Sequence, residues 1–179
     1  TIVTLPLVLP PTVIGFYLII FFNPETVLGK IFILLTGEQL IFSFYGLVLA
    51  SIIYSIPFWV QPLQASFEKI GRDTVRTSQS LGASSLGTFL HVIMPLCKKG
   101  FFTSFIISFA HTLGEFGIVL MVGGGIHGKT KVIAISIYDH VEQLSFGKAH
   151  ILAGGMLILS FIILLTLFYF NKRTVVRIK

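Results

Sequence analysis

The chain has 179 residues, of which 54% are hydrophobic and only 11% are charged, and its mean hydropathy is +0.93. Because a soluble domain carries roughly a quarter of its residues as charged side chains, this composition excludes an ordinary soluble enzyme and indicates an integral membrane protein. The formal net charge of +6 would favour nucleic acid in a soluble protein, but here the placement of the charges matters more than their sum, and no nucleic-acid partner is predicted.

Four apolar segments predict four membrane-spanning helices. Three of them, at 5–22, 39–67 and 151–170, contain no charged side chain, and each reaches the roughly 18 to 20 residues that a helix needs to cross a bilayer. The remaining segment, at about 101–126, carries only Glu115. Nothing alternates apolar with polar residues as a barrel strand would, and lipid offers the backbone no hydrogen-bond partner, so we expect an all-α membrane protein.

The first apolar segment is interrupted by prolines. Pro10 and Pro11 remove backbone donors, so they either mark a helix start near the interface or bend a helix beside a pathway. The segment that follows, 23–38, is interpreted as an outer loop, in which Asn23 or Thr26 caps a short turn.

Basic residues gather in two segments. Nine of the thirteen are Lys69, Arg72, Arg76, Lys98, Lys99, Lys172, Arg173, Arg177 and Lys179. The positive-inside rule therefore predicts that the 61–99 loop and the C-terminus are cytoplasmic. Four spans would then place the start of the chain in the cytoplasm as well. Because the chain opens directly on an apolar segment without a basic flank, we expect that a further N-terminal helix is missing from this sequence.

The cytoplasmic loop contains a stretch rich in small residues, "SQSLGASSLGTFLHVIMPLCKKG" at 78–100. Gly82 and Gly87 allow tight turns, and the residues between them leave a shallow surface. A short helix of this kind is suited to lie in a groove of another protein. The alternative is an ordinary solvated loop.

The third apolar segment contains Glu115, and an ionisable residue within a span is a functional candidate by default. One interpretation is structural: the carboxylate accepts hydrogen bonds from the backbone or from His111, one turn earlier, and fixes the helix beside Gly114 and Gly117. The other is a gate or conformational latch. His111 and Glu115 lack a third ligand for a metal, so no metal site, catalytic residue or cofactor is predicted. The helix is expected to end at the glycines 123–125.

The chain shows no internal repeat and no linker, which predicts one transmembrane domain over 1–179. It also lacks the G-x-x-x-x-G-K-S/T phosphate-binding motif, and "GGGIHGKT" at 123–130 does not follow a strand. The protein is therefore predicted not to be an enzyme, and any energy from ATP would come from another subunit. A secondary transporter remains a second interpretation, although it would need inverted repeats and coupling residues within the membrane.

The cytoplasmic loop resembles a motif of ATP-binding-cassette (ABC) importer permeases: E-A-A, three residues, G, nine residues, then I-x-L-P. The later positions agree in spacing and type: Gly82, Val92, Met94 and Pro95. The first three positions depart from the motif: Arg76, Thr77 and Ser78. Arg76 reverses the charge of the usual glutamate. The resemblance implies that this segment docks onto an ATPase subunit, and the docking region would also include Ser80, Leu81 and Ala83.

Four further stretches are similar to the molybdate permease branch of the ABC superfamily. They are "LPLVLPP" at 5–11, "SIPFWVQPL" at 55–63, "GEFGIVLMVGGGI" at 114–126 and "GKTKVIAISIYDHVE" at 128–142. The resemblance covers nearly the whole chain and implies a type I, MetI-like permease fold without its first helix. One departure is His111, where the family commonly has an arginine.

The resemblance also implies partners and a mechanism. Two permease copies would form a homodimer in the inner membrane, in contact with lipid, with two ATPase subunits in the cytoplasm and a periplasmic molybdate-binding protein outside. The pair would import molybdate by alternating access, with tungstate as a further candidate. A permease for sulfate, thiosulfate or another oxyanion is the alternative, because the sequence separates these substrates poorly.

Overall fold

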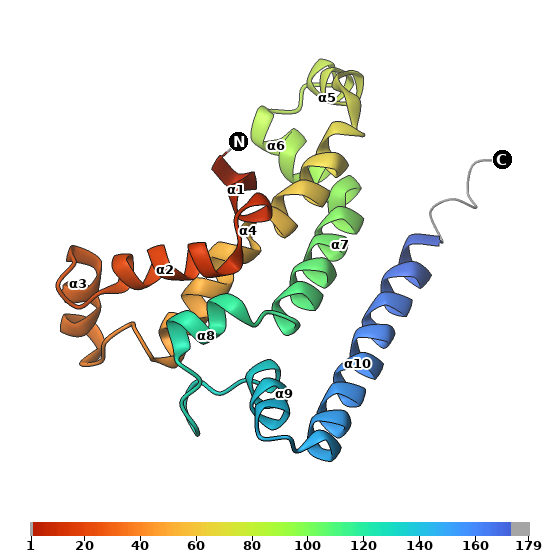
Figure 1. Ribbon diagram of the computed structural model, residues 1–179. Helices are drawn as coiled ribbons and strands as arrows, with labels where there is room; N and C mark the ends of the chain where they lie inside the picture. The colour runs from red at the N-terminus through yellow and green to blue at the C-terminus, as the bar shows by residue number, and fades with distance from the viewer. Residues whose placement is uncertain (1, 173–179) are drawn as a thin grey trace. The chain divides into compact units, whose positions relative to one another are not determined.

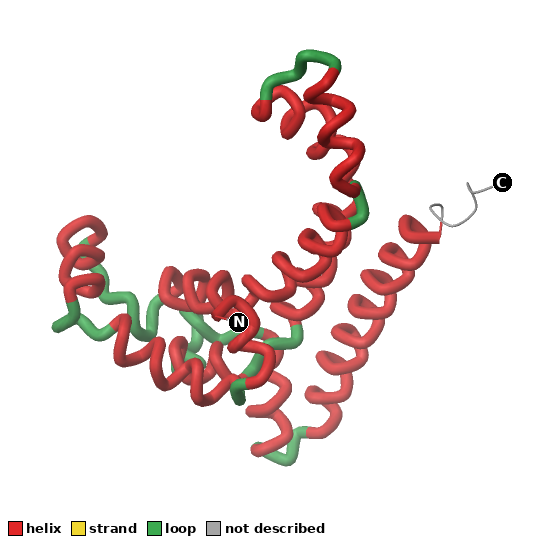
Figure 2. The backbone as a smooth tube through the Cα atoms, turned by 90° about the horizontal axis from the view of Figure 1, so that it is seen from above, coloured by secondary structure: helices red, strands yellow, loops and turns green. Residues whose placement is uncertain are grey.

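The computed structural model describes residues 2–172, and Arg173, Arg177 and Lys179 of the predicted cytoplasmic tail lie outside the described residues. Helices joined by loops make up this part of the chain (Figures 1 and 2). The elements are η1 (Ile2–Thr4), α1 (Leu5–Val8), α2 (Pro11–Phe22), α3 (Val27–Thr36), α4 (Phe44–Glu68), α5 (Gly71–Ser80), α6 (Ser85–Thr88), η2 (Phe89–Ile93), α7 (Met94–Leu113), α8 (Gly117–Gly123), α9 (Ile133–Glu142) and α10 (Phe146–Lys172). No strand occurs within residues 2–172, which confirms the predicted all-α class.

The chain forms two compact units. One is built from the stretch up to Pro57 together with His111–Ile162, and the other from Phe58–Ala110 together with the stretch after Ile162. The first unit holds α2, α3, α8 and α9, and the second holds the predicted coupling loop with α5 and α6.

Within residues 2–172, three stretches are long and apolar enough to cross a membrane: Phe44–Glu68, Ser85–Leu113 and Phe146–Tyr169. The pair α2 and α3, bent by 66°, adds a fourth if it counts as one broken span. The predicted spans at 39–67 and 151–170 thus coincide with helices, whereas the first and third predicted spans differ from the structure.

The first predicted span is two helices rather than one. Leu9 and Pro10 are extended, with ψ of 139° and 138°, so α1 stops at Val8 and α2 begins at Pro11. Proline suits the first position of a helix, because its missing N–H has no partner there in any case. The 12 residues of α2 cover only about 18 Å, which is less than the roughly 30 Å of a bilayer core.

The predicted outer loop contains a ten-residue helix, α3. The Thr26 hydroxyl caps its start by accepting a hydrogen bond from the Gly29 N–H (3.1 Å), and Gly37, with a φ of +74°, ends it. Thr26 therefore caps a helix, while Asn23 caps the short turn before it as predicted, because its Oδ1 accepts a hydrogen bond from the Glu25 N–H (2.9 Å).

The third predicted span begins earlier and is interrupted. It starts with α6 at Ser85, and α7 ends at Leu113. The chain then breaks before α8, which the left-handed Gly124 (φ +66°) terminates. The glycines thus end a helix as predicted, but that helix is the short α8.

The core of the first unit lies where α2 packs against α8 (Figure 1). A cluster of buried side chains joins these two helices to α4 and to the segment before it: Leu18, Phe22, Leu40, Ile41, Ala50, Tyr54, Ile118 and Val122. A second cluster, Leu47, Val119 and Ile135, connects α8 with α4 and α9. The break around Glu115 is held next to this core.

Candidate functional site

The middle of the predicted 61–99 loop folds into two short helices, α5 and α6, joined by a tight turn. Its two ends instead belong to α4 and to η2 with α7, so the loop is shorter than predicted. The chain leaves α4 at Glu68 and enters α5 at Gly71, whose φ is +72°. The turn after α5 contains Gly82 with a φ of +88°, a conformation that costs a residue with a Cβ about 1–2 kcal/mol. Ser84 then caps α6, because its hydroxyl accepts a hydrogen bond from the Gly87 N–H (3.1 Å). The glycine of the predicted motif is thus the residue that reverses the chain.

Side-chain and backbone hydrogen bonds close this turn. The hydroxyls of Ser78 on α5 and Thr88 on α6 lie 3.0 Å apart, and Thr88 is fully buried. The Ala83 N–H donates to the Ser78 carbonyl (3.2 Å) and the Gly82 N–H donates to the Gln79 carbonyl (2.9 Å). The segment from α5 to α6 is therefore a defined structural unit in which Ser78, a departure from the alanine of the motif, holds the two helices together.

The two halves of the predicted motif have different surroundings. The first half is exposed at Arg76, Thr77, Ser80 and Leu81, and Leu81 and Leu86 at the turn are 84% and 67% exposed. The second half, Val92, Met94 and Pro95, belongs to η2 and to the start of α7. The turn thus presents two strongly exposed leucines to a partner, while Phe89, Leu90 and Leu96 nearby are exposed to a lesser extent.

The π-helical segment η2 has a cause in the sequence. Pro95 has no N–H to donate, and a proline ring crowds the carbonyl four residues earlier, which here belongs to His91 within η2. Widening the turn before the proline relieves this crowding. The I-x-L-P part of the motif therefore shapes a wide turn within the spanning stretch Ser85–Leu113.

Glu115 lies in the break between α7 and α8 and is 7% exposed. Its Oε1 accepts a hydrogen bond from the Ile118 N–H at 3.0 Å. This N–H belongs to the first turn of α8, where backbone donors lack partners within the helix and negative charge is favourable. The geometry supports the structural interpretation, in which the carboxylate bonds to the backbone.

His111 stands one turn before Glu115 and packs its ring against Tyr54, with ring centroids 4.9 Å apart. Next to it, the hydroxyls of Thr112 and Ser55 lie 2.8 Å apart and connect α7 with α4. His111 is therefore placed among polar and aromatic groups within the first unit.

The two glycines predicted beside Glu115 differ in their surroundings. A Cβ at Gly117 would lie 2.9 Å from the Pro11 Cβ, whereas a Cβ at Gly114 would meet nothing nearer than the His111 carbonyl at 3.8 Å. Gly117 is thus required for the contact of α8 with the start of α2, and Gly114 is not.

Two residues that sequence reasoning missed complete these arrangements. At Gly15, a Cβ would lie 2.8 Å from the Met121 Cβ, so this glycine lets α2 approach α8. Thr88 holds α6 against α5. The signal for Gly15 was an isolated glycine within an apolar run, which often marks a close backbone approach; a single threonine in a polar loop carried no comparable signal.

Two substitutions of Glu115 distinguish the role of its hydrogen bond from the role of its charge. Glu115→Gln keeps an oxygen acceptor for the Ile118 N–H, whereas Glu115→Ala leaves this buried donor unpaired, which costs about 1–3 kcal/mol. We expect the thermal stability of the purified protein to fall in the alanine variant and to stay near wild type in the glutamine variant. A glutamine variant of normal stability that has lost transport would contradict the structural interpretation and support the gate.

Within residues 2–172, no group of three or more His, Cys, Asp or Glu side chains is arranged to hold a metal ion. In the stretch 123–130, the Thr130 hydroxyl donates to the Gly123 carbonyl and accepts from the Ile126 N–H (2.9 Å). This hydroxyl therefore serves to fold its own loop after α8.

Known transport permeases are similar in sequence to most of this chain. The Molybdenum transport system permease protein ModB of Azotobacter vinelandii is 49% identical over 167 residues, which are 93% of this chain and 74% of the relative. The ModB protein of Haemophilus influenzae is 33% identical over 141 residues, 79% of this chain and 62% of the relative. The Sulfate transport system permease protein CysT of Salmonella typhimurium is 29% identical over 163 residues, 91% of this chain and 58% of the relative.

These relatives are transport permeases and are longer than the stretch they share with this chain. Residues 1–175 also match the family described as Binding-protein-dependent transport system inner membrane component. The match confirms the resemblance to ABC importer permeases and, with the long apolar helices, identifies a multi-pass protein of the inner membrane. The chain belongs to the family of inner membrane components of binding-protein-dependent transport systems.

Proposed function

We propose that this chain is the permease subunit of an ATP-driven importer that moves molybdate into the cytoplasm. The observation that carries the proposal is the 49% identity to the Azotobacter permease, which extends over 93% of the chain. Tungstate, a tetrahedral dianion like molybdate, is a further candidate substrate. The sulfate permease at 29% identity makes sulfate, or thiosulfate, the second candidate.

In the proposed assembly, two copies of the chain enclose the anion pathway in the inner membrane. Two ATPase subunits bind on the cytoplasmic side, a periplasmic binding protein delivers the anion, and the C-terminus is cytoplasmic. Closure of the ATPase pair on ATP would push on the turn between α5 and α6, and the spanning helices would then exchange inward-open for outward-open states. The exposed Leu81 and Leu86 at this turn support its role as the docking surface.

The anion pathway would bind its substrate weakly. Within residues 2–172 the long apolar stretches offer the anion few cations, and Glu115 is buried against the α8 backbone, where its charge would repel a dianion. Weak binding suits a conduit, because a tightly held anion would leave slowly. We infer that selectivity comes mainly from the binding protein, while Glu115, Gly114, Gly117 and His111 shape the pathway or its gate.

Cellular molybdenum tests the proposal. We would measure it by mass spectrometry in cells that lack the gene and in complemented cells, at nanomolar molybdate with excess sulfate. We expect molybdenum to fall on deletion and to return on complementation despite the sulfate. If deletion leaves molybdenum unchanged and reduces sulfate uptake, the chain is an importer permease but its substrate is sulfate. If neither changes, both the importer function and the molybdate assignment are overturned.

A further inference from the structure

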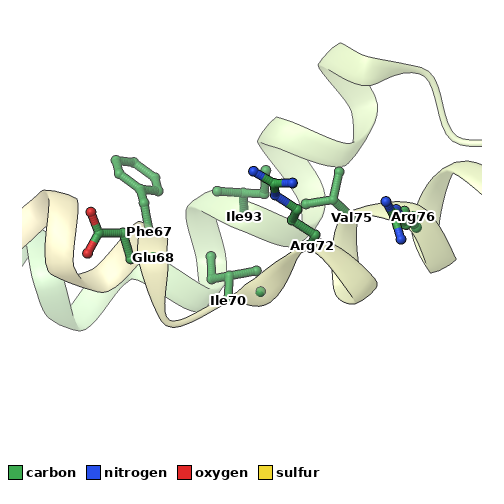
Figure 3. Close-up of a pocket in the computed structure, with 8 residues that line it drawn as sticks. Phe67, Glu68, Ile70, Arg72, Val75, Arg76 and Ile93 are labelled. Carbon is green, nitrogen blue, oxygen red and sulfur yellow. The ribbon is translucent and has the colours of Figure 1, made fainter.

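A cleft of about 510 Å³ lies beside the coupling loop, where α4 turns into α5 (Figure 3). Four of its lining side chains are apolar: Phe67, Ile70, Val75 and Ile93. They come from the end of α4, from α5 with the turn before it, and from η2. The cleft is thus an apolar space formed within the second unit alone.

Two arginines give this cleft a positive charge. Arg72 and Arg76 line it together, and because they are four residues apart on α5, they lie on the same face of that helix. Glu68 also lines the cleft, but its carboxylate accepts a hydrogen bond from the Gln64 amide (2.8 Å) and points away from both arginines (Figure 3). The charge that faces the cleft is therefore that of the two guanidinium groups.

The position of the cleft along the chain narrows the choice of ligand. Phe67 and Glu68 are the last residues of α4, a helix long enough to span the bilayer. The cleft therefore opens where a spanning helix leaves the membrane, on the side with the greater number of basic residues. An apolar pocket with a pair of guanidinium groups at that depth matches a phospholipid, since arginine binds phosphate oxygens through paired donors and apolar side chains accommodate an acyl chain.

We propose that this cleft binds one anionic phospholipid from the cytoplasmic leaflet. Arg72 and Arg76 hold its phosphate, and Phe67, Ile70 and Ile93 contact an acyl chain. The inference rests on the cytoplasmic placement of the loop in the proposed function, but not on the transported anion. A lipid fits better than an acidic side chain of the ATPase subunit, because the lining continues from a spanning helix while the exposed Leu81 and Leu86 lie at the other end of α5.

Lipid retention tests the site in the complete transporter. The assembled complex is placed in nanodiscs that contain equal amounts of phosphatidylcholine and phosphatidylglycerol. After release from the nanodiscs, native mass spectrometry identifies the lipids that stay bound to the complex. We expect wild type to retain phosphatidylglycerol in preference to phosphatidylcholine. Arg72→Gln with Arg76→Gln should lower this preference by about fivefold for each arginine. The matched control, Lys98→Gln with Lys99→Gln, removes the same charge from exposed positions outside the cleft and should leave the preference unchanged.

Each other outcome has a definite meaning. No preference in wild type, or an equal loss in the lysine control, overturns the site. If the double arginine variant retains phosphatidylglycerol but no longer co-purifies with the ATPase subunit, the arginines bind the protein partner instead. This result also overturns the lipid site. Competition by inorganic phosphate would show that the cleft takes the free anion rather than the lipid. Molybdenum uptake is measured separately from lipid retention. The lipid site can therefore be overturned while the proposed transport is supported, and the proposed transport can be overturned while the lipid site is supported.

Discussion

Gly82→Val is expected to abolish ATP-driven uptake while the protein still reaches the membrane. The φ of +88° at this position is a genuine outlier for a β-branched residue, so valine forces the turn between α5 and α6 into another conformation. That change displaces Leu81 and Leu86, the exposed apolar side chains of the proposed docking surface. A Cβ at Gly82 meets nothing within 4 Å, so the effect of the substitution comes from the backbone conformation and not from a clash of the Cβ. Uptake and the amount of protein in isolated membranes are measured together.

Gly82→Asn is the matched control, because asparagine enters the left-handed region several times more readily than most residues. We expect this variant to retain most of the uptake, although it also adds a side chain at the turn. Equal loss in both variants would mean that bulk at the surface, and not backbone conformation, blocks docking. Normal uptake in the valine variant would contradict the docking role, and so would loss of the protein from the membrane.

The turn within the coupling loop was predictable because the information for it is local, whereas its docking onto an ATPase subunit stays a prediction. Gly82, predicted to allow a tight turn, has a φ of +88°, whereas Gly87, for which the same was predicted, lies within α6. The hydrogen bond between Ser78 and Thr88 was not predictable, because it joins side chains ten residues apart. Their distance depends on the conformation of the turn between them, which the residue types alone do not determine.

The helix α3 was missed although the sequence carried its signals. Thr26 stands immediately before it and Gly37 immediately after it, which are a typical cap and a typical stop. The segment was assigned to an outer loop because it follows a span and is nearly neutral. Charge patterns place a segment on one side of the membrane but do not determine its secondary structure, so the near neutrality of 23–38 does not exclude a helix.

The break at Glu115 shows a different limit. Sequence reasoning placed the carboxylate within a continuous span, where its charge needs an explanation. The structure places it between two helices, where the Ile118 N–H is its partner. Just after the break, Gly117 lies against Pro11, more than a hundred residues earlier in the chain. No local pattern contains that contact.

Gly117→Ala is expected to destabilise the protein, because it adds a methyl group to the contact between α2 and α8. The new Cβ would lie 2.9 Å from the Pro11 Cβ, and a proline ring on a helix start has little freedom to move aside. The two helices must therefore separate by several tenths of an ångström, and overpacking of this kind costs about 1–3 kcal/mol. Adding Gly15→Ala, where the Cβ would lie 2.8 Å from the Met121 Cβ, should enlarge the loss. Thermal unfolding of the purified protein in detergent measures both variants.

Gly114→Ala is the control, since it makes the same chemical change three residues away in an exposed position where the nearest atom is 3.8 Å from the new Cβ. We expect its melting temperature to match that of wild type, while that of Gly117→Ala falls by several degrees. Equal losses in the two variants would mean that the break between α7 and α8 is the sensitive feature, and not the helix contact. A Gly117→Ala variant as stable as wild type would contradict the close packing of α2 on α8. If that stable variant had lost uptake, the contact would have to form during transport, and α2 and α8 would then move against each other in the cycle.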